Sequence, residues 1–205
     1  MGWWSERVVP IITEHACNTG EIRPYRKRQC EGLDGDVIEI GFGSGHNLAY
    51  LPSTVHGVWA VEPSGRSWEY ASKRIEKSPI PVKQAGLDGQ TLQLPDDFFD
   101  FALSTFTLCT IPDADAALRE LRRVLKPGGR FHFFEHGRSP DPKTARRQDR
   151  WDPIQQRLFA GCHTNRPITS MVEQAGFRIE HVENGYLKGP KVLGYVFEGV
   201  AVAPD

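Results

Sequence analysis

The chain has 205 residues, with 25 basic and 26 acidic side chains and a formal net charge of −1. This length suits one α/β domain with a substantial core, and the near balance of charge gives no electrostatic reason to expect a nucleic-acid partner. The four cysteines are scattered without a C-x-x-C pair, so no disulfide framework is indicated.

No targeting or membrane segment is evident in the sequence. No apolar run approaches the roughly 20 residues that span a bilayer, and the first residues lack the basic start and apolar middle of a signal peptide. We therefore expect a cytoplasmic protein, with an oligomeric state that the sequence leaves open. Trp3 and Trp4 are the one pair suited to peripheral contact with a membrane.

Residues 1–33 precede the first predicted strand and have a helical pattern. We expect them to form a lid over the carboxyl edge of the sheet, where such folds bind ligands. From residue 34 to 205, apolar runs alternate with amphipathic segments in one predicted domain. The predicted strands are 36–40, 56–62, 81–86, 99–105 and 129–136, with a closing pair at 177–184 and 191–202.

Three predicted helices lie between these strands. Residues 64–77 begin with a Ser cap, and residues 167–177 carry Pro in their first turn. Residues 113–129 have one apolar face, a cap at Asp113 or Asp115, and a Pro-Gly-Gly ending. The alternation of strands and helices predicts a doubly wound, parallel α/β sheet.

A glycine loop follows the first predicted strand, with Gly41, Gly43 and Gly45 at alternate positions. A dinucleotide fold requires its third glycine where this sequence has His46. Glu39, just before the loop, would repel a pyrophosphate but attract a cation. The loop therefore predicts a positively charged ligand that approaches the backbone closely.

The ends of the next strands suggest a nucleoside. Glu62, followed by Pro63, can accept two hydrogen bonds from a ribose diol. Asp88 can accept the adenine amino group, and the Gly89 amide can donate to a ring nitrogen. S-adenosylmethionine combines adenosine with a sulfonium and an amino-acid tail, and it fits this pattern. The remaining predicted cofactor contacts are Arg26, for the carboxylate of the tail, with Asn47 and Thr105.

Four segments resemble, in order, the motifs of class I S-adenosylmethionine-dependent methyltransferases, closest to the ubiquinone/menaquinone C-methyltransferase branch. They are VIEIGFGSGHN, VEPS, LQLPDDFFDFALST and RELRRVLKPGGRFHFFEHG. The resemblance implies a Rossmann-like sheet of seven strands, mostly parallel with an antiparallel final strand, and S-adenosylmethionine as the cofactor.

A narrower resemblance covers nearly the whole chain. TLCTIPD, EHGRS, RWDPIQQRLFAGCHTNRPI and GYVFEGVA are similar to a bacterial subgroup related to the mammalian microsomal alkyl-thiol methyltransferases. The microsomal enzymes carry an N-terminal membrane helix, whereas this sequence has only a short start with Trp3 and Trp4, so membrane embedding is not among the expectations that the resemblance carries over. The resemblance implies a small-molecule acceptor, with a small thiol or hydrogen sulfide favoured.

Three histidines and one arginine are the candidates for catalysis. A thiol acceptor benefits from a nearby base or cation that favours the thiolate. His136 follows the fifth strand, His163 lies between two helices, and His15 faces the site if its helix acts as a lid. Arg166 either meets the acceptor or locks its loop. A structural role remains the alternative for each histidine.

The cysteines are not expected to react or to bind metal. Cys109 and Cys162 are more typical of small buried apolar residues than of nucleophiles, because methyl transfer needs no covalent intermediate. His15, Cys17, Cys162 and His163 together offer a Cys2His2 set, but their spacing is not that of zinc modules. We predict no metal.

Three alternatives remain beside thiol methylation. The acceptor can instead be a quinone ring carbon or an amine or phospholipid headgroup. An NAD-dependent oxidoreductase is a different class, which His46 at the third glycine position argues against. The last alternative is a module that binds S-adenosylmethionine without catalysis.

Overall fold

The computed structural model describes residues 8–159 and 161–204, so the predicted membrane contact at Trp3 and Trp4 lies outside the described residues. The helices are α2 (Val9–Ala16), α3 (Arg23–Cys30), α4 (Gly65–Lys77), α5 (Ala114–Val124), α6 (Pro142–Leu158) and α7 (Ile168–Gln174), with a 3-10 helix, η1 (His46–Tyr50). The strands are β1 (Gly35–Ile40), β2 (Val55–Val61), β3 (Val82–Gly86), β4 (Phe99–Thr105), β5 (Leu125–His136), β6 (Arg178–Tyr186) and β7 (Tyr195–Val202).

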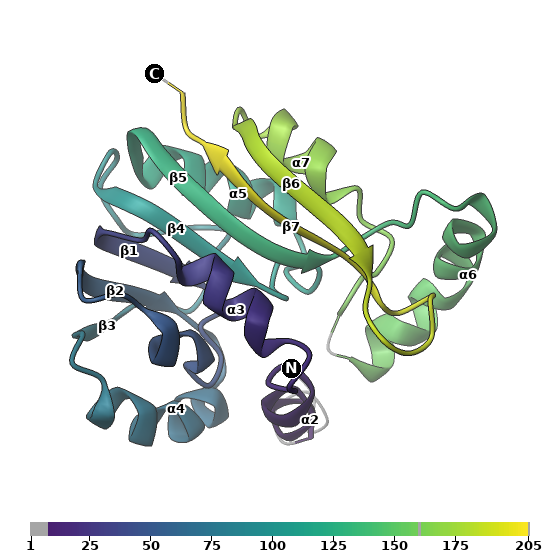
Figure 1. Ribbon diagram of the computed structural model, residues 1–205, viewed down its shortest axis with the longest axis horizontal. Helices are drawn as coiled ribbons and strands as arrows, with labels where there is room; N and C mark the ends of the chain where they lie inside the picture. Colours follow the sequence, from purple (N-terminus) through teal and green to yellow (C-terminus); the bar gives the residue numbers. More distant parts are fainter. Residues whose placement is uncertain (1–7, 160, 205) are drawn as a thin grey trace.

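The strands form one seven-stranded sheet in the order β3-β2-β1-β4-β5-β7-β6 (Figure 1). β3, β2, β1, β4 and β5 pair in parallel, whereas β7 is antiparallel to both β5 and β6. The predicted Rossmann-like fold with an antiparallel final strand is confirmed. Because the first five strands are parallel, their carboxyl ends meet at one edge, where the chain can build a binding site.

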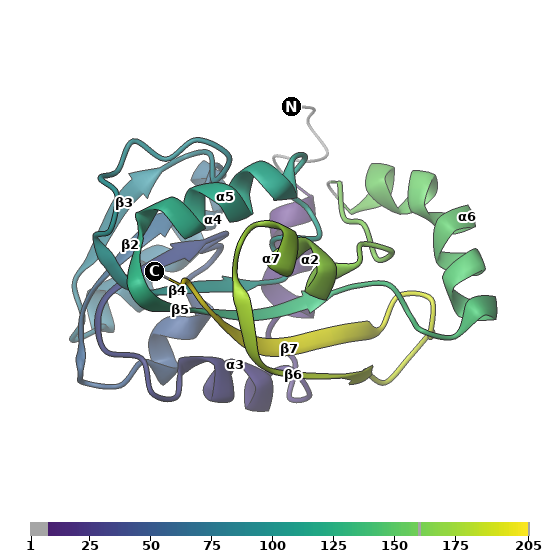
Figure 2. The same ribbon diagram turned by 90° about the horizontal axis from the view of Figure 1, so that it is seen from above.

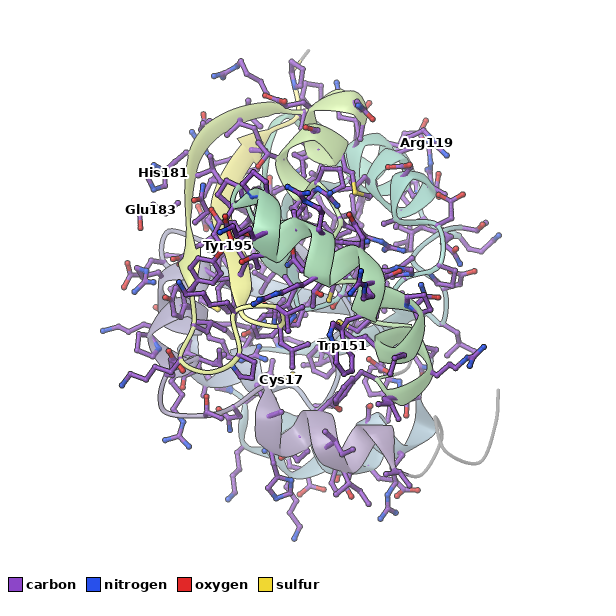
Figure 3. All side chains as sticks on the ribbon, turned by 90° about the vertical axis from the view of Figure 1, so that its right-hand side faces the viewer. Cys17, Arg119, Trp151, His181, Glu183 and Tyr195 are labelled. Atoms are coloured by element: carbon purple, nitrogen blue, oxygen red, sulfur yellow. The ribbon has the colours of Figure 1, made fainter. Side chains whose placement is uncertain are left out.

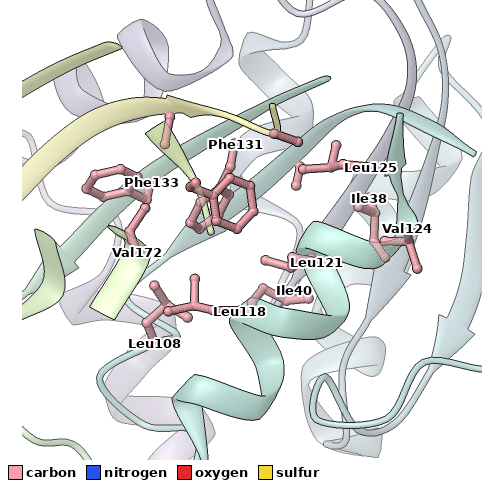
Figure 4. Packing of buried hydrophobic residues seen from close by; sticks show 14 of the residues in the cluster. Ile38, Ile40, Leu108, Leu118, Leu121, Val124, Leu125, Phe131, Phe133 and Val172 are labelled. Atoms are coloured by element: carbon pink, nitrogen blue, oxygen red, sulfur yellow. The ribbon is translucent and has the colours of Figure 1, made fainter. Parts of the chain in front are cut away.

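Helices cover both faces of the sheet. Figure 2 shows α5 and α7 on one face and α3 on the other. Leu118 of α5 and Val172 of α7 join a core cluster with Phe131 and Phe133 of β5 (Figure 4). On the opposite face, Ala71 of α4 packs in a second cluster with residues that follow α3 and line β1 and β2.

Helix α5 shows how local sequence sets this packing. The Asp113 side chain accepts a 2.8 Å hydrogen bond from the Ala116 amide, which caps the helix, and Asp115 lies in its first turn. Apolar residues at helical spacing, including Leu118 and Leu121, are fully buried against the sheet. Burial of each such leucine stabilises the fold by about 1.5–3 kcal/mol.

Two predicted boundaries were wrong. The helix predicted to reach residue 129 ends at Val124, because Leu125 turns to an extended conformation and pairs with Phe99. The glycines after Pro127 therefore lie where the register of β5 shifts, not at a helix end. The last strand begins at Tyr195 instead of 191, since a backbone bond from Leu193 to Pro190 makes a turn there.

The N-terminal helices divide between the edge and a face of the sheet. Tyr25 of α3 stacks on Phe134 with ring centroids 4.4 Å apart, and Arg28 pairs with Glu198 of β7. α3 thus covers a face of the sheet, which corrects the expectation that residues 1–33 all cover its edge. α2 does reach the glycine loop, because Glu14 pairs with Arg74 at 2.6 Å and Arg74 also donates to the Ser44 carbonyl at 2.9 Å.

Helix α6 stands beyond the carboxyl end of β5, on the right of Figure 1. A helix before His163 was expected from the sequence but its bounds were not predicted, and Pro153 lies inside it. Asp141 caps it by accepting from the Thr144 amide at 3.0 Å. Within the described residues, none of the helices has the length and apolarity required to cross a bilayer. The cytoplasmic location stays a prediction.

Candidate active site

The glycine loop between β1 and η1 is held in a left-handed backbone. Gly41, Gly43 and Gly45 have φ angles of +67°, +56° and +72°. A Cβ on Gly41 would lie 1.9 Å from the Thr107 hydroxyl oxygen, so only glycine lets the loop pack against the chain after β4. A Cβ on Gly43 would meet nothing nearer than 3.8 Å, which leaves open space on that side of the loop.

Glu62 lies directly after β2 and binds the loop. Its carboxylate accepts 2.8 Å hydrogen bonds from the amides of Gly43 and Ser64. The side chain is buried, and burial raises its pKa. Pro63, the next residue, is exposed. Glu62 therefore fixes the loop as well as presenting oxygens at the carboxyl edge.

A buried polar network starts at Glu39, in β1. Its Oε1 accepts from the Asn47 side-chain amide at 2.8 Å, and the same amide lies 3.2 Å from Thr105 Oγ1. Asn47 in turn accepts from Arg26 at 2.7 Å. Arg26 also donates to the Cys17 carbonyl, which ties the link between α2 and α3 to this network. The structure thus brings together four predicted cofactor contacts.

The second oxygen of Glu39 has no hydrogen-bond partner in the described structure, although the side chain is only 2% exposed. Burial raises the pKa of Glu39 to about 8, and the Asn47 bond and the Arg26 charge only partly oppose this. A buried carboxylate oxygen without a partner is costly. A cationic group of a ligand would satisfy it.

The predicted adenine contacts lie after β3. Asp88 is exposed, and its Oδ1 accepts from the backbone and side-chain amides of Gln90 at 2.9 and 2.8 Å. Gly89 is buried, and a Cβ there would lie 3.6 Å from Ile40 and Ile111. The carboxylate of Asp88 holds the turn through one of its two oxygens.

The predicted catalytic side chains are only partly brought together. His136, half-buried, stacks on Phe106, and its Nδ1 lies 3.9 Å from Cys109 Sγ. The His163 amide donates to the Cys109 carbonyl at 2.6 Å, but the His163 ring faces Asp152 at 3.0 Å. His15 is exposed, with its ring against the Ile11 carbonyl of its own helix at 2.9 Å.

Arg166 locks a loop. Its guanidinium donates to the carbonyls of Leu108, Ile111 and Pro112. Of the two roles considered for Arg166, these contacts correspond to holding the chain after β4 in place. The geometry does not bring Arg166 to the acceptor side as a free cation.

Two acidic residues beside the site, Glu135 and Glu14, were not assigned a role from the sequence. Glu135, the penultimate residue of β5, is fully buried and accepts from Ser104 Oγ at 2.6 Å and from the Thr107 amide at 2.9 Å. Glu14 of α2 lies 3.2 Å from His46 Nε2, without the geometry of a hydrogen bond. The signal for Glu135 is an acidic residue closing an apolar strand; Glu14 gives no such signal.

Comparisons with known proteins identify the class. Residues 38–133 match the family model described as a methyltransferase domain, Methyltransf_11. The human thiol S-methyltransferase TMT1A is 27% identical over 78% of this chain and 69% of its own length. The rat thiol S-methyltransferase TMT1B is 28% identical, and the match covers 73% of this chain but only 64% of that relative.

Other proteins that are similar to this chain are named for different reactions. The demethylmenaquinone methyltransferase of Corynebacterium efficiens is 32% identical over 60% of this chain and 53% of its own length. A putative methyltransferase structure from Bacillus halodurans superposes with a TM-score of 0.68 at 16% identity, covering 88% of this chain and 98% of that one. The [4+2]-cyclase SpnF superposes at 0.70 with 20% identity, covering 89% and 80%. At such identities the structures show the fold alone.

The chain carries a methyltransferase domain and is an S-adenosylmethionine-dependent methyltransferase. The site fits this cofactor, because the unpartnered Glu39 oxygen suits the ammonium of its amino-acid tail. When bound, the cofactor supplies a methyl group already activated by a sulfonium. The oxidoreductase alternative does not agree with these findings.

The raised pKa of Glu39 predicts a pH-dependent affinity. Near pH 7 the free protein holds this carboxyl mainly protonated, since its pKa is about 8. An ammonium at the free oxygen favours the carboxylate, so cofactor binding expels a proton. Affinity should rise by up to about tenfold per pH unit between about pH 6 and 8, and then fall as the cofactor's own amino group loses its proton at higher pH. Calorimetry in buffers of different ionisation enthalpy measures the released proton.

Glu39→Gln is the control for this release. The variant should bind the cofactor more weakly and lack the proton that wild type expels through Glu39. The difference between the two proteins removes any contribution from the cofactor's own amino group. Equal proton release by the two proteins would contradict the assignment of Glu39.

Proposed function

We propose that the chain transfers the methyl group of S-adenosylmethionine to the sulfur of a small thiol or hydrogen sulfide. The observation that carries the proposal is the similarity to thiol S-methyltransferases over 78% and 73% of the chain. The fold alone does not select an acceptor, since a [4+2]-cyclase shares it.

We propose the cofactor contacts from the network at the carboxyl edge. Glu39 binds the ammonium of the cofactor and is itself held by the side-chain amide of Asn47, which also contacts Thr105. Arg26, hydrogen-bonded to Asn47, binds the carboxylate of the cofactor. Glu62 receives the ribose hydroxyls, and its position between the amides of Gly43 in the loop and Ser64 at the start of α4 supports this role. Asp88 and Gly89 bind adenine. The loop of Gly41, Gly43 and Gly45 lets the cofactor lie against the backbone.

The N-terminal segment is proposed to close the cofactor site through α2 and the link at Cys17. Glu14 and Arg26 support this, since they tie that segment to the glycine loop and to Asn47. Deleting residues 1–20 should leave a folded sheet but abolish turnover, because the cofactor tail loses its cover. Circular dichroism and a turnover assay measure both effects, and full activity of the truncated protein would refute the closure.

Methyl transfer is an in-line displacement, so the chain chiefly has to align sulfur and methyl. A base is needed only to take the proton from the thiol. His136 is the histidine best placed, since it lies at the carboxyl end of β5, near Cys109. His163 is a weaker candidate, because Asp152 occupies its Nδ1.

A quinone-type acceptor is the second candidate. Its support is the 32% identity to a demethylmenaquinone methyltransferase and an apolar stripe on α6. Trp151, Ile154 and Leu158 are 50%, 47% and 47% exposed and share one helix face. Such a stripe suits a hydrophobic acceptor.

A panel of acceptors separates the two candidates. Thiols and hydrogen sulfide should be methylated with a kcat/KM at least about tenfold above that of amines, phenols and quinols. Labelled S-adenosylmethionine measures transfer to each. If a quinol or an amine is methylated and no thiol is, the sulfur proposal fails and the second candidate replaces it.

A further inference from the structure

Three sulfur and nitrogen ligands converge beside the proposed acceptor position. Cys109 follows β4, His136 ends β5, and Cys162 follows α6. Their ligand atoms all lie within 4.8 Å of one another. Cys109 Sγ is 3.7 Å from Cys162 Sγ and 3.9 Å from His136 Nδ1. The set of His15, Cys17, Cys162 and His163, which was considered from the sequence and set aside, is not the group that converges among the described residues.

These spacings are those of ligands around one tetrahedral cation. Sulfur atoms bound at about 2.3 Å to one zinc ion lie roughly 3.8 Å apart, and a sulfur and an imidazole nitrogen roughly 3.6 Å apart. A disulfide would require sulfurs about 2.05 Å apart. Two cysteines and one histidine are also a known ligand set for catalytic zinc, which keeps a fourth position open.

The surrounding residues hold the two cysteines in place. The Cys109 amide donates to Glu135 at 3.3 Å, and its carbonyl accepts from the His163 amide at 2.6 Å. Gln155 of α6 donates to Cys162 Sγ at 3.6 Å. The hydrogen bond between the two thiols, with His136 beside them, lowers the pKa of Cys162. Neighbours that orient the ligands in this way are typical of metal sites.

The cluster lies at the same edge as the cofactor site. The loop that carries Cys109 follows β4 and includes Thr107, whose side chain packs against Gly41. The Cys17 carbonyl accepts a hydrogen bond from Arg26. The pKa of the Cys17 thiol is raised to about 11, chiefly by burial and in part by Cys162. Figure 3 faces this side of the molecule, with α6 in front and Cys17 at the end of α2. The cysteine cluster and the cofactor network therefore flank one region.

We propose that Cys109, His136 and Cys162 bind a thiophilic divalent cation, with zinc the best fit, whose fourth position takes the sulfur of the acceptor. This inference rests on the proposed thiol methylation. His136 then holds the cation and does not act as the base, so the acceptor thiol loses its proton to solvent on binding. Its sulfur then forms a bond to the methyl carbon as the carbon–sulfonium bond breaks. The products are S-adenosylhomocysteine and a thioether, or methanethiol when the acceptor is hydrogen sulfide, and the cation is unchanged.

Cobalt(II) is the probe for this site. Reduced full-length protein, first stripped with a chelator, should bind one Co²⁺ and develop thiolate-to-cobalt charge-transfer absorption, which Zn²⁺ then displaces. Cys109→Ser, Cys162→Ser and His136→Ala should each weaken binding by at least about tenfold. Cys30→Ser, a buried cysteine beside the Asn47 carbonyl, should bind as wild type does. Circular dichroism confirms that each variant folds.

Three outcomes would overturn the metal site. The first is wild-type protein that binds neither Co²⁺ nor Zn²⁺. The second is unchanged binding by a Cys109→Ser/Cys162→Ser double variant. The third is metal-free protein in which these two thiols form a disulfide under reducing purification. If the Cys17→Ser variant loses metal binding, the fourth coordination position is not open, because Cys17 would then be a fourth ligand.

The test separates this inference from the proposed function. If cobalt binds but no thiol is methylated, the proposed acceptor fails and the metal site stands. If thiols are methylated at the full rate by metal-stripped protein, the acceptor stands and the metal inference fails. Addition of a thiol should also shift the cobalt absorption, and an unchanged spectrum would contradict coordination of the acceptor.

Discussion

Glu62→Ala should weaken S-adenosylmethionine binding by at least about 100-fold. Two charge-assisted hydrogen bonds to the ribose would be lost, at about 1.5–3 kcal/mol each, and each 1.4 kcal/mol is tenfold in affinity. The variant also loses the carboxylate that accepts from Gly43 and Ser64, so the loop itself becomes less ordered. Calorimetry with S-adenosylmethionine and S-adenosylhomocysteine measures the change.

Two carboxylates provide matched controls for Glu62. Glu69 lies on the exposed side of α4, where it pairs with Arg66, so Glu69→Ala should leave binding unchanged. Asp88→Ala should reduce affinity less than Glu62→Ala, because it removes one adenine contact from an exposed side chain. Normal cofactor binding by a folded Glu62→Ala protein would show that the ribose assignment is wrong.

Gly41→Ala should destabilise the fold by about 2–5 kcal/mol and abolish activity. An L-residue in the left-handed region costs about 1–2 kcal/mol, and overpacking adds about 1–3 kcal/mol. The new Cβ would lie 1.9 Å from Thr107 Oγ1, and the Thr107 backbone is fixed by its hydrogen bond to Glu135. Chemical denaturation measures the free energy of unfolding.

Two other glycines separate strain from collision. Gly43 also has a positive φ, but a Cβ there would have no atom nearer than 3.8 Å, so Gly43→Ala adds only the strain of about 1–2 kcal/mol. Gly65 begins α4 in open space, and Gly65→Ala should be neutral or slightly stabilising. Equal losses for Gly41→Ala and Gly43→Ala would contradict the contact with Thr107.

The sequence predicts the cofactor-binding residues because the patterns that mark them are local in the chain. Glu39 and Glu62 stand at or beside the ends of apolar strands, and parallel pairing of β1 with β2 brings them to one edge. The alternation of strands and helices predicts all seven strands, including the closing pair. The boundary at Val124 was missed, since the Pro-Gly-Gly sequence is typical of a helix end but lies here in β5.

The acceptor side depends on contacts between distant segments, which no local pattern encodes. Arg166 binds the carbonyls of Leu108 and Ile111, more than fifty residues earlier in the chain. Cys109 and Cys162 meet through the path of α6, a helix whose mixed surface and internal proline give a weak periodic signal. The expectation that no metal binds was based on sequence spacing, whereas the further inference depends on the folded positions.

The most direct test of the account is the product formed from one acceptor that carries both a thiol and a second nucleophile. Cysteamine and 2-mercaptoethanol offer sulfur beside an amine and a hydroxyl. With S-adenosylmethionine labelled by ¹³C in its methyl group, the NMR shift of the product identifies the atom that received it. The account predicts methyl on sulfur alone for both acceptors. Methyl on nitrogen or oxygen, or transfer to a quinol with none to sulfur, would contradict it.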